Sequence, residues 1–340
     1  MAEMVAAIAT SHTPLLVTDV EHWPELGRRD RSNKMLYDDR GRHRSYDDLA
    51  TEMGDRFAAD LRPEMLAHRW ALCQAALDRL ATTLAAAEPD VVIIVGDDQH
   101  ELFGPANQPA VAVFWGEVIR TGVSAAPASP LSDQIKAGYA MDRHHELAGS
   151  PALALDLIGS LVARGFDVAS VADNPPATGD GAGNAHDGFG HAYGFVARRL
   201  LGEPTPPGEP TPPIVPVLLN TFYPPNQPAP ARCHDLGRAL ASAIGESSLP
   251  LRVALVASGG LSHFVVDEKL DDVVLGALRS GHAEPLRSLP TQLLEAGSSE
   301  IRNWITVAGA MGEKSVQWAE YVPVRRSPAG TGVGCAFASW

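Results

Sequence analysis

The stretch that decides the fold is residues 89–103, PDVVIIVGDDQHELF. Residues 91–95 form an unbroken β-branched run, which predicts a strand covered on both faces. The run stops at Gly96, and the polar sequence 97–101 follows directly. Open α/β sheets gather their functional groups just beyond the carboxyl ends of their strands. This stretch therefore predicts both a central strand and one wall of a site.

The segments on either side of this stretch alternate between helical and strand-like patterns. Residues 64–88 carry apolar side chains at three- and four-residue spacing, which predicts an amphipathic helix that ends at Pro89. The alternation predicts an α/β fold with a central, mostly parallel or mixed sheet and helices on both faces. We expect further strands at 5–10, 110–114, 166–171, 215–220 and 252–258, and helices at 153–164, 233–244, 267–279 and 290–297.

Three segments interrupt the alternation. Residues 20–60 are polar and predict an excursion of short helices, one of which starts after Ser45. Residues 174–187 are rich in Gly, Pro and Asp and predict a loop. Residues 202–213 repeat an E-P-T-P-P unit and predict an extended, proline-rich loop. No clear boundary divides the chain, so we expect one domain over residues 1–340.

Composition excludes several classes of function. The 340 residues are 45% hydrophobic and carry a net charge of −14, and such an acidic chain lacks the basic patch that nucleic-acid binding needs. The three cysteines form no C-x-x-C pair, which argues against a cysteine zinc site and favours a reducing, cytoplasmic location. No apolar run is long enough to predict a membrane-spanning helix.

Ligand-type side chains follow four of the expected strands or loops. His12 follows the first strand, the acidic cluster 97–101 follows the second, His191 lies beyond the glycine-rich loop, and His263 follows the strand that ends at Ser258. A lone histidine at a strand end is commonly structural. Four such positions together predict a site at one edge of the sheet.

Several motifs, in this order, resemble the class III extradiol dioxygenases. The likeness is greatest to the catalytic subunit of protocatechuate 4,5-dioxygenase and to the 3-O-methylgallate dioxygenases, and it covers most of the chain outside 20–60 and 202–213. The motifs are SHTP (11–14), PDVVIIVGDDQHELF (89–103), GHAYGF (190–195), YPP (223–225), SGGLSH (258–263) and LEAGSSEIRNWITVAGAM (294–311).

The resemblance implies a site chemistry. The family opens catechol rings with O2 at a mononuclear Fe(II) held by two histidines and one carboxylate, a triad that leaves coordination positions open. His12 matches the first ligand in its SHxP setting. His191 matches the histidine that acts as the acid–base catalyst. His263 falls beside the pocket, either as a catalytic residue in contact with substrate or as a support for its loop.

The two other ligand positions differ from the family pattern. Alignment places Gln99 at the second histidine, and it places Lys269 at the carboxylate with Glu268 beside it. Gln99 and Glu268 are therefore the expected remaining ligands. A protonated lysine repels a dication, so Lys269 is unfavourable for iron. Glu101 and His186 complete the set that we expect to contact the substrate.

Three functions follow from these residues. The first is a ring-cleaving dioxygenase that uses Fe(II) and O2 on a catechol- or gallate-type phenolic acid. The second is a metal-independent C–C hydrolase, decarboxylase or tautomerase of a phenolic compound, with His191 and Lys269 as the working pair. The third is a non-catalytic binding subunit, which the retained His191 disfavours. In each case a small-molecule ligand and a homo-oligomer, by default a homodimer, are expected.

Overall fold

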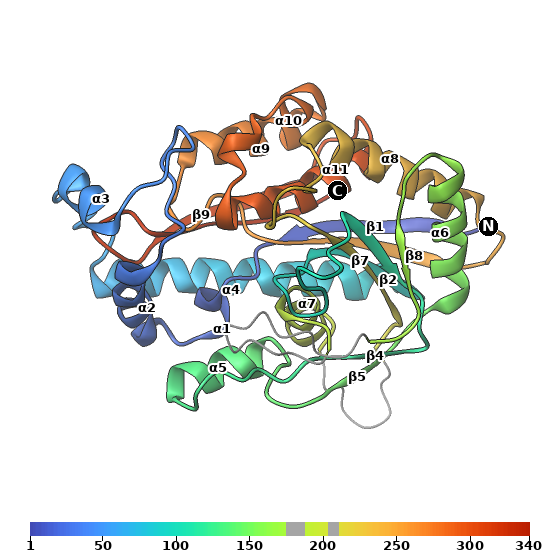
Figure 1. Ribbon diagram of the computed structural model, residues 1–340, viewed down its shortest axis with the longest axis horizontal. Coiled ribbons are helices and arrows are strands. Elements are labelled where there is room, and N and C mark those ends of the chain that lie inside the picture. The colour runs from blue at the N-terminus through green and yellow to red at the C-terminus, as the bar shows by residue number, and fades with distance from the viewer. Residues whose placement is uncertain (175–187, 203–210) are drawn as a thin grey trace.

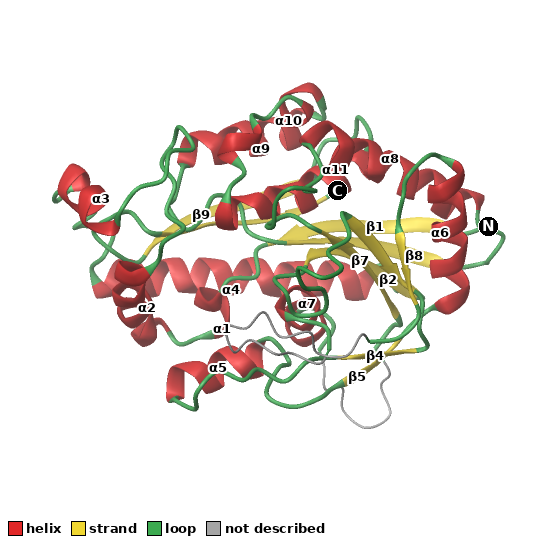
Figure 2. Ribbon diagram, viewed as in Figure 1, coloured by secondary structure: helices red, strands yellow, loops and turns green. Residues whose placement is uncertain are grey.

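A mixed sheet of eight strands forms the centre of the molecule (Figures 1 and 2). The structure is a computed structural model that describes residues 1–174, 188–202 and 211–340. In spatial order the strands are β6 (Ala169–Val171), β3 (Val111–Phe114), β7 (Ile214–Leu219), β2 (Val91–Asp97), β8 (Arg252–Ser258), β1 (Glu3–Thr10), β10 (Gly332–Ser339) and β9 (Trp318–Arg325). A separate antiparallel pair joins β4 (Val118–Arg120) to β5 (Glu146–Ala148). The expected α/β fold with a mixed sheet is confirmed.

The middle of the sheet is parallel. Strands β7, β2, β8 and β1 run in the same direction, whereas β3 pairs antiparallel with β7 and β10 pairs antiparallel with β1. The register places Thr10 opposite Ser258 and Asp97 opposite Leu219. The last residues of these four strands therefore lie along one edge, which is where polar side chains follow β1, β2 and β8.

Helices cover both faces of the sheet, as expected (Figure 1). One apolar core lies between the sheet and α6, α8, α9 and α11, and a second lies between the sheet and α4 and α7. The helices are α1 (Pro14–Val17), α2 (Trp23–Arg29), α3 (Tyr46–Met53), α4 (Pro63–Ala86), α5 (Pro130–Gly138), α6 (Pro151–Ala163), α7 (His191–Arg199), α8 (Pro230–Glu246), α9 (Glu268–Ser280), α10 (Glu284–Arg287) and α11 (Ile301–Met311).

The excursion at 20–60 consists of short helices, as the sequence predicts. Helix α3 begins after Ser45, whose side-chain oxygen accepts a hydrogen bond from the Asp48 N–H as an N-cap. The expected loop at 174–187 and most of the proline-rich segment at 202–213 lie outside the described residues. Among the described helices, none combines the length and apolar character needed to cross a bilayer.

The C-terminal quarter differs most from the prediction. The helix expected at 290–297 is instead two 3₁₀ turns, Thr291–Leu293 and Ala296–Glu300, and the regular helix there is α11. Every residue of α11 from Ile301 to Gly309 is buried. The polar residues Arg302, Asn303 and Thr306 of this helix are buried together with its apolar residues, so the helix has no solvent-exposed polar face that the sequence pattern could reveal.

Candidate functional site

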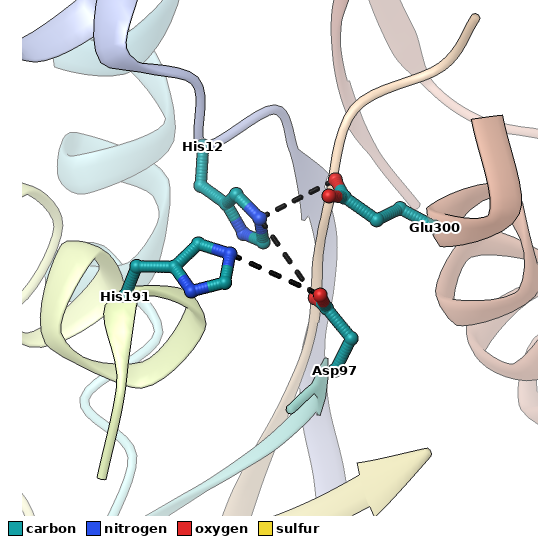
Figure 3. Close-up of side chains that lie close together, drawn as sticks. All are labelled: His12, Asp97, His191 and Glu300. Carbon is teal, nitrogen blue, oxygen red and sulfur yellow. Dashed lines mark ion pairs between the residues drawn. The ribbon is translucent and has the colours of Figure 1, made fainter. Parts of the chain in front are cut away.

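Four buried or half-buried side chains converge at the carboxyl edge of the sheet (Figure 3). His12 follows β1, Asp97 ends β2, His191 begins α7, and Glu300 is the last residue of the 3₁₀ turn before α11. One ligand atom from each residue lies within 4.8 Å of the others. Two imidazoles and two carboxylates at this spacing form a potential site for a divalent metal ion.

The His12 ring is held in one tautomer. Its Nδ1 lies 2.8 Å from the Ser258 hydroxyl, and that hydroxyl donates its proton to the Ala192 carbonyl at 2.7 Å. Ser258 can therefore only accept from His12, so the proton of a neutral ring sits on Nδ1. The Nε2 lone pair then faces the cluster and has no hydrogen-bond partner among the described residues. A histidine that binds a metal through one ring nitrogen typically donates a hydrogen bond from the other, as His12 Nδ1 does to Ser258.

Glu300 is fixed by hydrogen bonds to both of its carboxylate oxygens. The backbone N–H of Gly260 donates to Oε2 at 2.6 Å, and His263 Nε2 lies 3.2 Å from Oε1. Burial would raise the pKa of Glu300, but the neighbouring His263 and His12 hold it well below its usual value. Glu300 is therefore a carboxylate, with Oε2 lying 3.3 Å from His12 Nε2.

His263 supports this arrangement from the loop after β8. Its Nδ1 lies 2.7 Å from the Leu261 carbonyl while its Nε2 faces Glu300, so both ring nitrogens act as donors when the ring is protonated. Burial would lower the pKa of His263, whereas Glu300 raises it. The peptide bond between His263 and Phe264 is cis. His263 thus lies in the site, where it contacts the Glu300 carboxylate.

Asp97 and Gln99 occupy the side of the cluster nearest β2. The Gln99 amide donates to Asp97 Oδ2 at 3.3 Å and reaches Glu300 Oε1 at 3.5 Å. Burial and the nearby Glu300 raise the pKa of Asp97. Asp97 Oδ1 has no hydrogen-bond partner among the described residues and lies 3.8 Å from His12 Nε2.

The donor set fits a cation. Two orphaned acceptors, His12 Nε2 and Asp97 Oδ1, lie buried together beside the Glu300 carboxylate. Unsatisfied buried acceptors cost free energy, and a divalent ion would satisfy both at once. Imidazole and carboxylate ligands suit Fe(II) and Mn(II).

His191 is paired with Glu101. Its backbone N–H and its Nδ1 lie 3.1 Å and 2.7 Å from Glu101 Oε1, and its Nε2 lies 3.8 Å from Asp97 Oδ2. Burial would lower the pKa of His191, but Glu101, Asp97 and Glu300 raise it to about 10. The residue before His191 is glycine because a Cβ there would lie 1.7 Å from Glu101 Oε2.

A cavity of about 370 Å³ opens onto the cluster. This volume is typical of a site for a small organic molecule. The excursion at 20–60 forms part of its wall and contributes Arg29. The side chains that line it include His12, Leu26, Arg29, Gln99, Glu101, Tyr139, Met141, His191, His263, Phe264, Glu300 and Arg326.

The structure does not bring Lys269 and Glu268 into this cavity, so their expected roles require correction. Both residues begin α9, where the Asp267 side chain accepts hydrogen bonds from the N–H groups of Lys269 and Leu270. The Lys269 side chain is 86% exposed and pairs with Asp39. Glu268 is half-exposed and pairs with Arg325. The proposed His191–Lys269 pair therefore does not form, and His186 lies outside the described residues.

Sequence reasoning missed two members of the cluster. Glu300 lies within the matched motif at 294–311, but the sequence alignment places the carboxylate ligand at 268–269, shortly after SGGLSH. The useful signal is an acidic residue at the start of a segment rich in apolar residues, since a carboxylate that is buried there must have a partner. Asp97 belongs to the cluster 97–101, but the sequence does not separate it from the neighbouring Asp98, which caps a turn by accepting from the N–H groups of residues 101–103.

Comparison with known proteins shows the family of the chain. The family model of the catalytic LigB subunit of aromatic ring-opening dioxygenases matches residues 57–334. A 2,3-dihydroxyphenylpropionate/2,3-dihydroxicinnamic acid 1,2-dioxygenase from Comamonas testosteroni is 26% identical over 201 residues, which are 56% of this chain and 49% of that protein. The match thus spans about half the length of that relative. The chain belongs to the LigB family of aromatic ring-opening dioxygenases.

Proposed function

We propose that this member of the LigB family opens the ring of a catechol-type aromatic acid with O2, using Fe(II) held beside His12 and Glu300. The observation that carries the proposal is the pair of buried, orphaned acceptors that face one point at the end of a cavity of about 370 Å³. When bound, Fe(II) would supply the electron transfer to O2 and open positions for a diol.

His191 is placed to move a proton. Glu101 holds its Nδ1 at 2.7 Å, which leaves Nε2 directed toward the cluster and the cavity. A divalent cation among these carboxylates would lower the pKa of His191 from about 10 toward neutrality. In that state His191 Nε2 can take the proton of a substrate hydroxyl and return it later to the ring-opened product.

An acidic substrate is supported by the arginines of the cavity. The Arg326 side chain is 8% exposed and donates two hydrogen bonds of 2.8 Å to Asp30. Arg29 is half-exposed, and within the described part of the chain its guanidinium pairs with Glu25 alone, four residues earlier on α2. Such exposed pairs contribute about 0.3–0.5 kcal/mol, so Arg29 can turn to a substrate carboxylate at little cost. The relative from Comamonas is named for two dihydroxyaryl acids.

Oxygen uptake by the reconstituted protein tests the proposal. The protein would be loaded with Fe(II) under anaerobic conditions and then supplied with O2 and a panel of carboxylated catechols and gallates. We expect stoichiometric O2 consumption with at least one of them, and none with the matched His12→Gln variant. Binding of less than about a tenth of an equivalent of iron, with no O2 uptake on any catechol, would contradict the proposal.

Two properties of the whole protein remain proposals. A reducing, cytoplasmic location is supported by the cysteines Cys73, Cys233 and Cys335, which are all buried and free. A homo-oligomer is the default for a chain of this kind, and light scattering of the purified protein would test it.

A further inference from the structure

We propose that the metal in this chain is held by one imidazole and two carboxylates, through His12 Nε2, Asp97 Oδ1 and Glu300 Oε2. The inference rests on the proposed function in one respect, because both place a divalent metal at the cluster. It departs from the two-histidine, one-carboxylate triad that the resemblance implies. It makes Asp97 a ligand and leaves Gln99 and His191 outside the coordination sphere.

The distances favour this set. Metal–ligand bonds of about 2.1 Å at right angles place neighbouring donor atoms about 3.0 Å apart. His12 Nε2 lies 3.3 Å from Glu300 Oε2 and 3.8 Å from Asp97 Oδ1. These separations need only a small inward movement of each side chain around an ion. Figure 3 shows the His12 ring directed at both carboxylates.

The two oxygens of Asp97 have different surroundings. Oδ2 accepts from the Gln99 amide at 3.3 Å and lies 3.8 Å from His191 Nε2. Oδ1 faces His12 and has no hydrogen-bond partner among the described residues. Asp97 is fully buried, so a cation beside Oδ1 would stabilise its charged form. One oxygen is therefore oriented by its neighbours and the other is free to bind the metal.

Gln99 presents the wrong atom for a ligand. Its amide lies beside two carboxylates, and only the NH2 group can donate to them. The Gln99 side chain therefore orients Asp97 and Glu300. Gln99 is neutral, so the negative charge that would balance a dication comes from the carboxylates of Asp97 and Glu300.

His191 is held back from the ion by its partner. Both its backbone N–H and its Nδ1 face Glu101 Oε1, and its Nε2 lies 3.8 Å from Asp97 Oδ2. In this arrangement the His191 ring would lie beside a bound ion and would not coordinate it. Two carboxylates and one imidazole form a hard donor set, which suits Mn(II) as well as Fe(II).

Manganese binding to matched variants tests the inference without any turnover. Titration of the metal-free protein with Mn(II), followed by EPR, gives the affinity of the wild type, Asp97→Asn and His191→Gln. Loss of a group that only orients a metal ligand typically weakens metal binding about 10- to 100-fold. Asp97→Asn would remove a ligand itself, so we expect it to weaken Mn(II) binding by more than about 100-fold. We expect His191→Gln to weaken Mn(II) binding by less than about tenfold. The reverse order would overturn the inference.

Two further measurements complete the test. Asp97→Asn removes a buried charge, so the metal-free variant should unfold at the same or a higher temperature, which separates metal loss from misfolding. Pulsed EPR of the Mn(II) protein should detect one coordinated histidine nitrogen, which His12→Gln abolishes and His191→Gln retains. Two coordinated nitrogens would overturn the inference even if ring opening is observed. Metal binding through Asp97 without O2 uptake would instead contradict only the proposed function.

Discussion

Two glutamates in the last third of the chain, Glu268 and Glu300, have opposite environments. Glu268 lies in the first turn of α9, where its side chain is 51% exposed and pairs with Arg325. Glu300 is 3% exposed, accepts a hydrogen bond from the Gly260 N–H, and lies 3.3 Å from His12 Nε2. The same chemical group is therefore a surface ion pair in one region and part of a buried cluster in the other.

The comparison shows what proximity in sequence leaves out. Glu268 follows SGGLSH by only a few residues, yet the Asp267 cap starts a helix that turns it to the surface. Glu300 is much farther along the chain, but α11 packs against β8 and β1, and this packing brings its first turn to the strand ends. The carboxylate of the buried cluster is therefore identified by the burial of the helix that follows it and not by its spacing from a motif.

The largest expected effect comes from Glu300→Gln with Glu268→Gln as the matched control. Glu300→Gln removes a charge that faces His12, so we expect loss of bound Fe(II) and a decrease in ring-opening activity of more than about 1,000-fold. Glu268→Gln should retain activity within about twofold. Metal analysis and O2 uptake measure both, and equal losses in the two variants would remove the distinction between the two regions.

A smaller effect is expected when the proton carrier is removed. His191→Gln should lower kcat by about 10²- to 10⁴-fold, the usual contribution of a positioned acid–base group, while iron content stays within about twofold. Steady-state O2 uptake and metal analysis of the same preparation distinguish this outcome from loss of a ligand. An unchanged kcat would exclude His191 from proton transfer.

Most of the fold could be predicted from the sequence because its central strands carry unbroken apolar runs. The run at 91–95 and the amphipathic helix at 64–88 appear as β2 and α4 with small shifts at their ends. The hairpin of β9 and β10 and the buried helix α11 were not expected. The buried polar residues Arg302, Asn303 and Thr306 obscure the apolar face of α11 in the sequence. The pairing of β10 with β1 joins the two ends of the chain, so it depends on contacts that no local pattern shows.

The site was predictable to a similar extent. His12, His191 and His263 each follow a recognisable motif, and the structure brings all three to the cluster or its rim. Glu101 was expected to contact substrate, and it lines the cavity while it holds His191. The hydrogen-bonding roles of Gln99 and Asp97 depend on atoms from β2, α7 and α11, so no local pattern could supply them.

Charge at the cavity wall should affect substrate affinity more than turnover. Arg29→Gln removes a cation that can face a substrate carboxylate, so we expect KM for carboxylated catechols to rise about tenfold with little change in kcat. The KM for an uncharged catechol should not change. A matched variant at the neighbouring surface, Arg28→Gln, is the control. Equal effects on charged and uncharged substrates would contradict a carboxylate contact.

The smallest effect is expected at Lys269. Its side chain is 86% exposed and pairs with Asp39, so Lys269→Glu should leave activity and iron content within about twofold of the wild type. Steady-state kinetics measure this directly. A loss of activity of more than about tenfold would return Lys269 to the site and would contradict the geometry described above.

The position of the bound metal tests the central claim most directly. Crystals of the protein loaded with Fe(II) or Mn(II) would be measured at the absorption edge of the metal, and the anomalous difference map would locate the ion. We predict one peak within about 2.4 Å of His12 Nε2 and of a Glu300 carboxylate oxygen, with Glu268 and Lys269 remote from it. A peak beside Glu268, or none at His12 and Glu300 in fully loaded protein, would contradict the account.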